Sequence, residues 1–235
     1  MTRRRPLAKA ALAMTLCLTV LAPVARSAEA AVAPTFERAW TTGNGSPSLP
    51  VAIATDPASG SVYVSNFFSN RIERYDVDGA FLGQWGGPGS GTGQFNLPQG
   101  VAVGPDGSVY VADTGNNRIQ RFTATGTFVA TWGTAGSGNG QFNRPMGVAV
   151  DSSGHVYVTD TNNNRVQKFT ATGTYRTRWG RGGTAAGRFN APTGIAISAD
   201  RKVYVVDTGN DRVQQFSGTG TFGRMWGAGG TGQGQ

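Results

Sequence analysis

A repeat of 47 residues is the feature that most restricts how this chain can fold. Four of the five tryptophans, Trp85, Trp132, Trp179 and Trp226, follow one another at this interval, and Trp40 lies 45 residues before the first of them. Two other residue types keep the same step: Pro98, Pro145 and Pro192, and Arg71, Arg118, Arg165 and Arg212. A period of this length predicts stacked structural units that cannot bury their hydrophobic faces alone.

The second copy of the repeat shows what each unit contains. Four short segments rich in strand-forming residues lie at 101–103, 109–113, 118–122 and 127–132. Turn residues, mainly glycine, asparagine and proline, separate these segments. Because connections this short join antiparallel neighbours, each copy is expected to be a four-stranded meander.

The pattern therefore predicts an all-β fold, a β-propeller built of four four-stranded blades. The expected segments are a signal peptide at 1–30, a linker and lone outer strand at 31–48, and blades at 49–96, 97–143, 144–190 and 191–235. Each tryptophan is expected to share one face of the fourth strand with the aromatic residue four positions earlier, as Trp132 does with Phe128. These rings are predicted to pack neighbouring blades together.

The extra outer strand predicts that the ring is not sealed. Residues 36–40 match only the fourth strand of a blade, yet the last copy already has its own fourth strand, which ends at Trp226. Two explanations stay open. The chain is either a fragment of a larger propeller ring, or an open arc that self-associates with a second copy through exposed blade edges.

The second copy resembles the NHL repeat. The residues that carry the resemblance are Leu-Pro-Gln-Gly-Val-Ala-Val at 97–103 and Val-Tyr-Val-Ala-Asp-Thr-Gly-Asn-Asn-Arg-Ile-Gln-Arg-Phe at 109–122. The resemblance recurs in four copies and implies a propeller, similar in repeat type to the sensor domains that some actinobacterial receptor kinases display outside the cell. It implies little about function, because propellers of this family host binding, sensing and lyase activities.

The N-terminus has the layout of a secretory signal. Basic residues within the first nine positions precede an apolar run at 10–24, and small residues surround Ala30, after which we expect cleavage. The run is shorter than a membrane span and contains Pro23, so no stable membrane anchor is expected after cleavage. An Arg-Arg pair resembles a twin-arginine signal, but Pro6 favours the general export route. The mature protein is therefore expected to be secreted or extracytoplasmic.

Removal of the first 30 residues changes both the charge and the cysteine count. The whole chain carries a formal charge of +8, but 16 basic and 12 acidic residues follow residue 30, which gives +4. This mild charge suits an anionic cell wall and equally an ordinary soluble surface. Cys17, the only cysteine, lies in the signal, so the mature chain is expected to have neither disulfides nor cysteine metal sites.

Positions that differ between the copies are the best candidates for binding a partner. Phe67 and Phe68 lie in a loop where the second copy has Thr-Gly-Asn-Asn. Two adjacent aromatic residues on a polar loop indicate an interface anchor, unless one of them covers the end of the first blade. The residue after each repeat proline also varies and is expected on the same rim. These residues are Val51, Gln99, Met146 and Thr193.

The third copy carries four arginines within thirteen residues. Strand alternation places Arg176 and Arg178 on the face opposite Trp179, and Arg181 and Arg188 follow. This basic patch is predicted either to bind anionic wall polymers or to discourage strand pairing at a solvated edge. Export and the absence of base-stacking aromatics from the patch argue against a nucleic-acid partner.

An acidic and a basic residue recur five positions apart in three copies, as Asp113 and Arg118, Asp160 and Arg165, and Asp207 and Arg212. Such a pair can bind an anionic ligand. Its recurrence favours instead a structural role in fastening a loop in every blade. The same argument assigns a structural role to the tryptophans at 40, 85, 132, 179 and 226.

Signs of catalysis are few. The inner segments carry no histidine or carboxylate at their starts, and His155, the sole histidine, is expected on an exposed turn. Residues 160–164 resemble a calcium loop superficially, but Arg165 stands where glycine is needed. We therefore expect no catalytic residue, no metal site and no cofactor.

The sequence favours a noncatalytic binding or sensing scaffold whose partner is a protein or a cell-wall polymer. The alternatives are a metal-assisted lyase or lactonase-like enzyme whose ligands come from missing blades or a partner copy, and a truncated, nonfunctional fragment.

Overall fold

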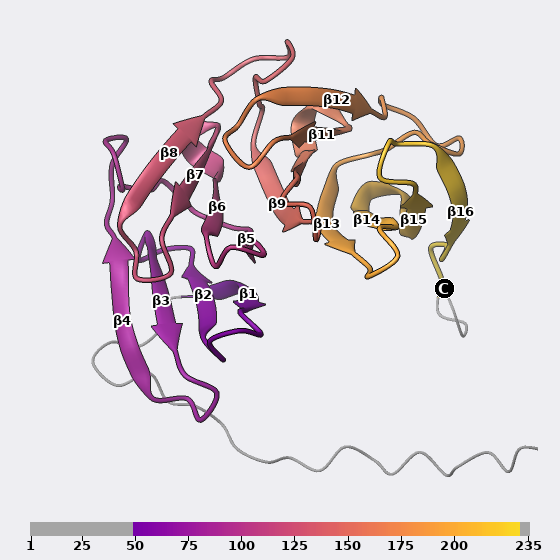
Figure 1. Cartoon of the computed structure of the whole chain (residues 1–235). Coiled ribbons are helices and arrows are strands. Elements are labelled where there is room, and N and C mark those ends of the chain that lie inside the picture. Colours follow the sequence, from indigo (N-terminus) through magenta and orange to yellow (C-terminus); the bar gives the residue numbers. More distant parts are fainter. Residues whose placement is uncertain (1–48, 231–235) are drawn as a thin grey trace, which may run out of the picture. The chain divides into compact units, whose positions relative to one another are not determined.

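The computed structural model describes residues 49–230, all of which belong to one compact unit, and it confirms the all-β prediction. Sixteen strands within these residues form four antiparallel four-stranded sheets (Figure 1). Each sheet is one blade, and its strands follow one another in sequence order. The predicted signal peptide and the lone outer strand at 31–48 lie outside the described residues.

The four blades have closely matching strand bounds. Blade 1 consists of β1 (Pro50–Thr55), β2 (Val62–Asn66), β3 (Arg71–Tyr75) and β4 (Phe81–Gly86). Blade 2 consists of β5 (Val101–Val103), β6 (Val109–Asp113), β7 (Arg118–Phe122) and β8 (Phe128–Trp132). Blade 3 consists of β9 (Pro145–Val150), β10 (Val156–Asp160), β11 (Arg165–Phe169) and β12 (Tyr175–Trp179). Blade 4 consists of β13 (Pro192–Ile197), β14 (Val203–Asp207), β15 (Arg212–Phe216) and β16 (Phe222–Trp226).

The turn between the second and third strands is tighter than a plain loop. In blade 2 it closes as a single turn of 3-10 helix, η1 (Thr114–Asn116), and Asn117 ends it in the left-handed conformation with φ of 54°. Asn164 and Asp211 take the same conformation after η2 (Thr161–Asn163) and η3 (Thr208–Asn210). Asparagine and aspartate tolerate this region better than other non-glycine residues, which explains their place in the repeat.

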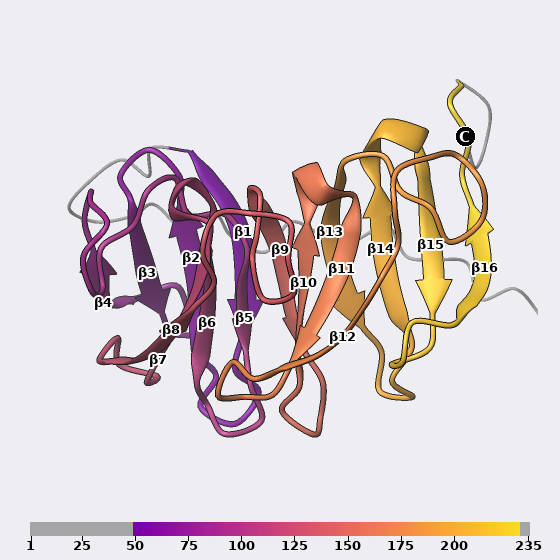
Figure 2. The ribbon, with the colours of Figure 1, turned by 90° about the horizontal axis from the view of Figure 1, so that it is seen from above.

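The blades follow one another through their inner strands. β1 contacts β5, β5 contacts β9, and β9 contacts β13, so that the four inner strands face one central space (Figure 1). Figure 2, turned by 90°, shows the blades as successive sheets, each beside the next. The hydrophobic core is divided accordingly into three clusters, one at each boundary between blades.

An indole ring packs across each of these boundaries. Trp85 of blade 1 lies 5.7 Å from the ring of Phe122 in blade 2, and Trp132 and Trp179 make the same contact with the next blade at 6.0 and 5.9 Å. Gly173 of blade 3, with φ of 88°, lies so close to the Trp132 indole that an added Cβ would approach it to 2.6 Å. The predicted packing of the tryptophans between neighbouring blades is therefore present.

The prediction that the second aromatic ring shares a face with the tryptophan is wrong. Phe128 contacts Phe122 and belongs to the cluster between blades 1 and 2, whereas Trp132 belongs to the cluster between blades 2 and 3. The reason is a β-bulge. Arg121 pairs with Ala130 but Phe122 pairs with Phe128, so the alternation of side chains along β8 is broken between the two rings. β8 thus serves both of its neighbouring boundaries, and β12 does the same through Tyr175 and Trp179.

Trp226 occupies the same place in the last described blade, and it is 45% exposed. The described residues contain no further blade for it to contact. Its neighbour across the sheet is Tyr204, at 5.9 Å between ring centroids.

This difference between equivalent tryptophans predicts unequal effects on stability. Replacing Trp132 with alanine removes a ring from a core cluster and should cost about 3 to 5 kcal/mol of unfolding free energy, whereas Trp226→Ala should cost much less. Urea denaturation followed by circular dichroism measures both. Equal losses would contradict the assignment of Trp132 to the interblade core.

Candidate functional site

The starts of the four inner strands meet in one cavity of about 330 Å³. The residue that directly follows the repeat proline near the start of each inner strand lies in the lining of this cavity. These four residues are Val51, Gln99, Met146 and Thr193. The structure therefore brings together the four variable positions that the sequence places on one rim. We call this cavity the central pocket.

The backbone around the central pocket is fixed by the blade that precedes each inner strand. The amide of Leu97, which precedes Pro98, donates to Asn70 Oδ1 at 2.7 Å, and the equivalent amides of Arg144 and Ala191 donate to asparagine side chains at 2.8 Å. Leu97 has φ of 52°, a strained left-handed conformation that this hydrogen bond helps to hold. The backbone at the start of these inner strands is thus held by the preceding blade, independently of the inner strands' own side chains.

Hydroxyl groups fix the carbonyl oxygens next to the same positions. Thr159 Oγ1 donates to the Thr193 carbonyl at 2.7 Å, and Ser65 Oγ donates to the Gln99 carbonyl. Thr114 Oγ1 reaches the carbonyl of Pro145 at 2.7 Å. Because the backbone polar groups are engaged with the neighbouring blade, ligand contacts in the pocket depend mainly on the variable side chains.

The central pocket has an uncharged lining. Around the variable side chains lie aliphatic residues and Gly100, Gly147 and Gly194, and no charged residue is among the lining residues. Gln99 and Thr193 supply the polar side-chain groups, and Met146 supplies a flexible apolar one. This composition suits neutral groups of a ligand and gives no attraction to an isolated charge.

Phe67 and Phe68 lie near this end of blade 1. The Phe67 amide donates to the carbonyl of Leu49 at 3.1 Å, two residues before Val51. Phe67 is partly buried, whereas Phe68 is 63% exposed, and their rings meet edge to face at 5.1 Å. The sequence offered two roles for these rings, covering the end of the blade or facing a partner. The partly buried Phe67 fits the first role, and the exposed Phe68 fits the second.

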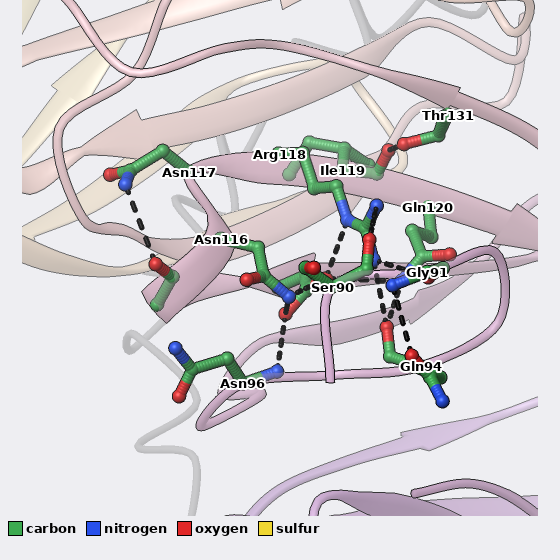
Figure 3. A network of polar contacts seen from close by, with 12 residues as sticks. Ser90, Gly91, Gln94, Asn96, Asn116, Asn117, Arg118, Ile119, Gln120 and Thr131 are labelled. Carbon is green, nitrogen blue, oxygen red and sulfur yellow. Dashed lines mark hydrogen bonds and ion pairs between the residues drawn. The ribbon is translucent and has the colours of Figure 1, made fainter. Parts of the chain in front are cut away.

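The aspartate and arginine of the repeat form a buried clamp (Figure 3). Arg118 Nε lies 2.7 Å from Asp113 Oδ2, and Asp113 is fully buried. The remaining guanidinium donors reach three backbone carbonyls of the connection between blades 1 and 2, those of Ser90, Gly91 and Gln94. The pair therefore holds the connection between blades, not only the loop between its own two strands.

Two further side chains complete the clamp. Gln120 donates to Asp113 Oδ2 at 3.1 Å and to the Gln94 carbonyl at 2.7 Å, and Asn116 donates to both oxygens of Asp113. The same network recurs in blades 3 and 4 around Asp160 and Asp207. The carboxylate and the guanidinium are both saturated by protein groups, which leaves no free fork for a ligand.

Blade 1 lacks this clamp. Asn66 replaces the aspartate and is fully buried, with no hydrogen-bond partner for either side-chain atom. Arg71 Nε lies 3.3 Å from Glu73, which stands where the other blades have glutamine, and Glu73 accepts a 2.6 Å hydrogen bond from Tyr75. The first blade therefore departs from the repeat in a group of residues, not only at the two phenylalanines.

His155 is less exposed than the sequence predicts. Its Nδ1 lies 3.1 Å from Oδ2 of the buried Asp151, and its side chain is 32% exposed. Asp151 also accepts hydrogen bonds from the His155 amide at 2.9 Å and the Tyr157 hydroxyl at 3.0 Å. The turn that carries His155 follows β9, so the histidine lies at the opposite end of the inner strand from Met146. The only sign of this contact in the repeat pattern is the replacement of Ser108 by histidine at the equivalent position.

Arg176 and Arg178, two of the basic residues of the third copy, are exposed on β12. Arg178 and Arg181 line a shared cavity beside β12, whereas Arg176, two residues earlier, is not in its lining. In the described part of the chain no group of three or more His, Cys, Asp or Glu side chains is gathered as a metal site would require. Nor does any helix there have the length and hydropathy to cross a membrane.

Comparison with known families matches the NHL repeat model to residues 95–122, 142–169 and 189–216. Each match runs from the phenylalanine before an inner strand to the phenylalanine that ends the third strand. Blade 1 is outside the matched residues, although its four strands are present. The departures at Asn66, Phe67 and Phe68 lie within this blade.

Known proteins that resemble the chain have diverse functions. Mouse peptidyl-glycine alpha-amidating monooxygenase is 38% identical over 61 residues, which is 24% of this chain and 6% of that enzyme. The streptogramin B lyase structure superposes with a TM-score of 0.60 at 19% identity, covering 78% of this chain and 56% of that one. A nidogen/laminin complex gives 0.56 at 18% identity over 75% of this chain and 62% of that chain. The chain thus spans only part of each of these proteins, and the structural likenesses concern the fold alone.

The clamp predicts a large loss of stability when its arginine is removed. Arg165→Ala leaves the carboxylate of Asp160 buried without its cation and should lower the unfolding free energy by about 3 to 5 kcal/mol. The matched control is Arg176→Ala, which removes an exposed arginine from the same blade and should change stability little. Thermal and urea denaturation compare the two, and a similar loss in both variants would contradict the clamp.

The environment of Asp151 predicts a dependence of stability on acid pH. Burial alone raises the pKa of this carboxyl, but hydrogen bonds from the His155 amide and the Tyr157 hydroxyl outweigh it and hold the pKa below 3.8. The unfolded chain therefore binds the proton at higher pH than the folded chain, and stability should fall as the pH drops below about 4.

Unfolding free energy measured between pH 6 and pH 2 tests this sign. Asp151→Asn should give a shallower acid slope than the unmodified chain, whatever its stability at neutral pH. The control is Asp211→Asn, which removes an exposed carboxyl at a position where blades 2 and 3 have asparagine. An unchanged slope in Asp151→Asn would be the contrary result.

Proposed function

Because this chain is an NHL repeat-containing β-propeller protein, we propose that it is a noncatalytic binding or sensing scaffold that works outside the cytoplasm. Its partner, a protein or a cell-wall polymer, meets the rim formed by the central pocket and Phe68. Export is supported by the basic and apolar segments of the first 30 residues.

One observation carries the proposal. In blades 2, 3 and 4 the residue that lines the central pocket stands between an unchanged proline and an unchanged glycine, yet it is glutamine, methionine or threonine. The architecture therefore fixes the backbone at this position and does not dictate the side chain. Side chains that vary on a fixed frame, and that converge on one cavity, are the usual basis of selective binding in propellers and other repeat folds.

The chemistry of the rim favours a protein over a charged polymer. The pocket lining carries no charge and includes the exposed aliphatic residues Val51 and Ile53 of blade 1, and Phe68 is exposed in the same blade. Exposed aromatic residues next to a shallow cavity are typical of protein-binding surfaces, where a few such side chains carry most of the affinity. Wall polymers remain the alternative partner in the experiment below.

The likeness to streptogramin B lyase motivates a second function, a metal-assisted lyase or lactonase-like enzyme. Enzymes, sensors and binding modules share this fold, so the likeness by itself does not select among them. The one histidine contacts Asp151 at the far end of its inner strand from the central pocket. Stoichiometric calcium or zinc in the purified protein, measured by elemental analysis, would support the enzyme instead.

The proposed function predicts that variants of the rim lose a partner. The triple variant Gln99→Ala, Met146→Ala, Thr193→Ala and the single variant Phe68→Ala should each weaken binding at least about tenfold. The control variant combines Leu82→Ala and Val129→Ala, which remove exposed apolar side chains from the fourth strands of blades 1 and 2, away from the pocket lining.

The experiment uses the immobilised full chain and two probes, the protein fraction of the culture medium and purified wall polymer. A protein retained by the unmodified chain and by the control, but not by the rim variants, supports the proposal. Retention of wall polymer alone, with the same dependence on the rim, would replace the protein by the polymer as partner. Retention that is equal in all variants, or absent from all of them, contradicts the proposal.

A further inference from the structure

The charge of the described chain is uneven along its length. Between Asp160 and Asp200 there is no acidic residue, whereas six basic residues fall in this interval. They are Arg165, Lys168, Arg176, Arg178, Arg181 and Arg188. Most of the interval belongs to blade 3, so this blade presents cations with few carboxylates to neutralise them.

Three of these arginines, Arg165, Arg178 and Arg181, line one cavity. Arg178 of β12 and Arg181, just after it, line this cavity of about 430 Å³. Ser137, from the connection between blades 2 and 3, and Asn163, from η2, form other parts of its wall. Three separate segments of the chain therefore converge around two guanidinium groups, which we call the arginine pocket.

The donors of the other polar residues in this wall are already engaged. Arg165 uses its guanidinium on Asp160 and on the carbonyls of Ser137, Gly138 and Gln141. Asn163 donates to the Gly136 carbonyl and to Asp160. These two residues repeat the clamp that Figure 3 shows one blade earlier, and they give the arginine pocket a rigid floor.

The side chains of Arg178 and Arg181, unlike those of Arg165 and Asn163, have few partners in the protein. Arg178 has a single contact, from Nη1 to the Ser137 carbonyl at 3.5 Å, which is the outer limit of a hydrogen bond. The Arg181 carbonyl accepts a hydrogen bond from the Phe189 amide at 3.0 Å, but the Arg181 guanidinium makes no hydrogen bond or ion pair with any described residue. Nearly all the N–H donors of both guanidinium groups are therefore free to bind a ligand.

The fold does not require either arginine. At the position of Arg178 the other blades have Gln84, Thr131 and Met225, and at the position of Arg181 they have Gly87, Thr134 and Ala228. Blade 2 in particular forms the same strand and the same clamp with two threonines. These two cations therefore occur in one blade only, and the other blades fold without them. Such a pair is better explained by binding than by the fold.

We propose that the arginine pocket binds a phosphate group carried by an anionic polymer. Two guanidinium forks offer parallel pairs of N–H donors, and each phosphate along a polymer presents a negative charge and two non-bridging oxygens that such a fork can bind. The polymer follows from the cations that continue beyond the pocket. Arg176, two residues before Arg178 in β12, is also exposed.

Lys168, in β11 of the same blade, is a further cation near Arg176. Burial lowers the pKa of this lysine, the charge of Asp151 raises it, and the charges of Arg176 and Arg201 lower it. Lys168 pairs with Thr177 and Arg178 pairs with Gln167, so Lys168 lies on the other face of the blade 3 sheet from Arg178. Lys168, Arg176 and Arg201 are near enough for their charges to interact, and we call these three residues the basic track. A polymer with phosphates along its length can contact the pocket and the track together, and each additional phosphate contact adds to the affinity.

The double variant Arg178→Thr, Arg181→Thr tests this site, because it copies the residues of blade 2. Its control is Lys202→Thr, Arg224→Thr, which removes two exposed cations from blade 4. Polyphosphate of defined length, inorganic phosphate and polyglutamate serve as probes in calorimetric titrations at two salt concentrations. All three proteins should keep the same melting temperature within a few degrees.

We expect polyphosphate to bind the unmodified chain and the control alike, and to bind the pocket variant at least about tenfold more weakly. Equal losses in variant and control would overturn the site, because binding would then follow net charge alone. Equal affinity for polyglutamate would overturn the assignment to phosphate. If inorganic phosphate bound as tightly as polyphosphate, the assignment of the ligand to a polymer would be wrong. The rim variants should bind polyphosphate normally, so the two proposals fail independently.

Discussion

The contact between an indole ring and the next blade is the interaction on which the rest of this structure depends. A four-stranded sheet of about 40 residues cannot bury both faces, and each blade gains its core only from its neighbours. Trp85, Trp132 and Trp179 supply that contact at the three described boundaries. The β-bulge in each fourth strand follows from the same need, because it allows one strand to send an aromatic ring to the boundary on either side. The bulge is therefore a structural element of the repeat and not an irregularity.

Apolar packing between blades does not hold the long connections that join one blade to the next. The buried clamp holds these connections. Its carboxylate, guanidinium and glutamine amide bind backbone groups of a connection that is rich in glycine and has few side chains to pack. The asparagine at the end of the turn between the second and third strands holds the residue before the next inner-strand proline, in blade 1, which lacks the clamp, as well as in blades 2 and 3. The position of the central pocket is thus the result of contacts made at several positions of the preceding blade.

The sequence predicts most of the frame, because its turn residues and spacing reflect local rules. The strands β5, β6 and β7 begin and end at the expected residues, and β8 differs by one. The place of Phe128 could not be predicted, since alternation along a strand carries no sign of a bulge. The hydrogen bonds of Asp151 with His155 and Tyr157 depend on how one turn folds over a strand end. The cavity beside Arg178 depends on Ser137, which belongs to a connection that arrives from the blade before and which no local pattern contains.

Four copies of one unit provide an internal comparison that a single domain lacks. A residue that keeps its identity and its contacts in several blades, as Arg118 and Arg165 do, is explained by the fold. A residue that changes while the backbone around it stays the same needs another explanation. By this criterion the central pocket and the arginine pocket are separate, since the first is uncharged and draws one side chain from each blade, whereas the second lies at one boundary and is cationic. Their chemistry is too different for one ligand group to occupy both, so a partner that engages both surfaces must present apolar and anionic groups at different points.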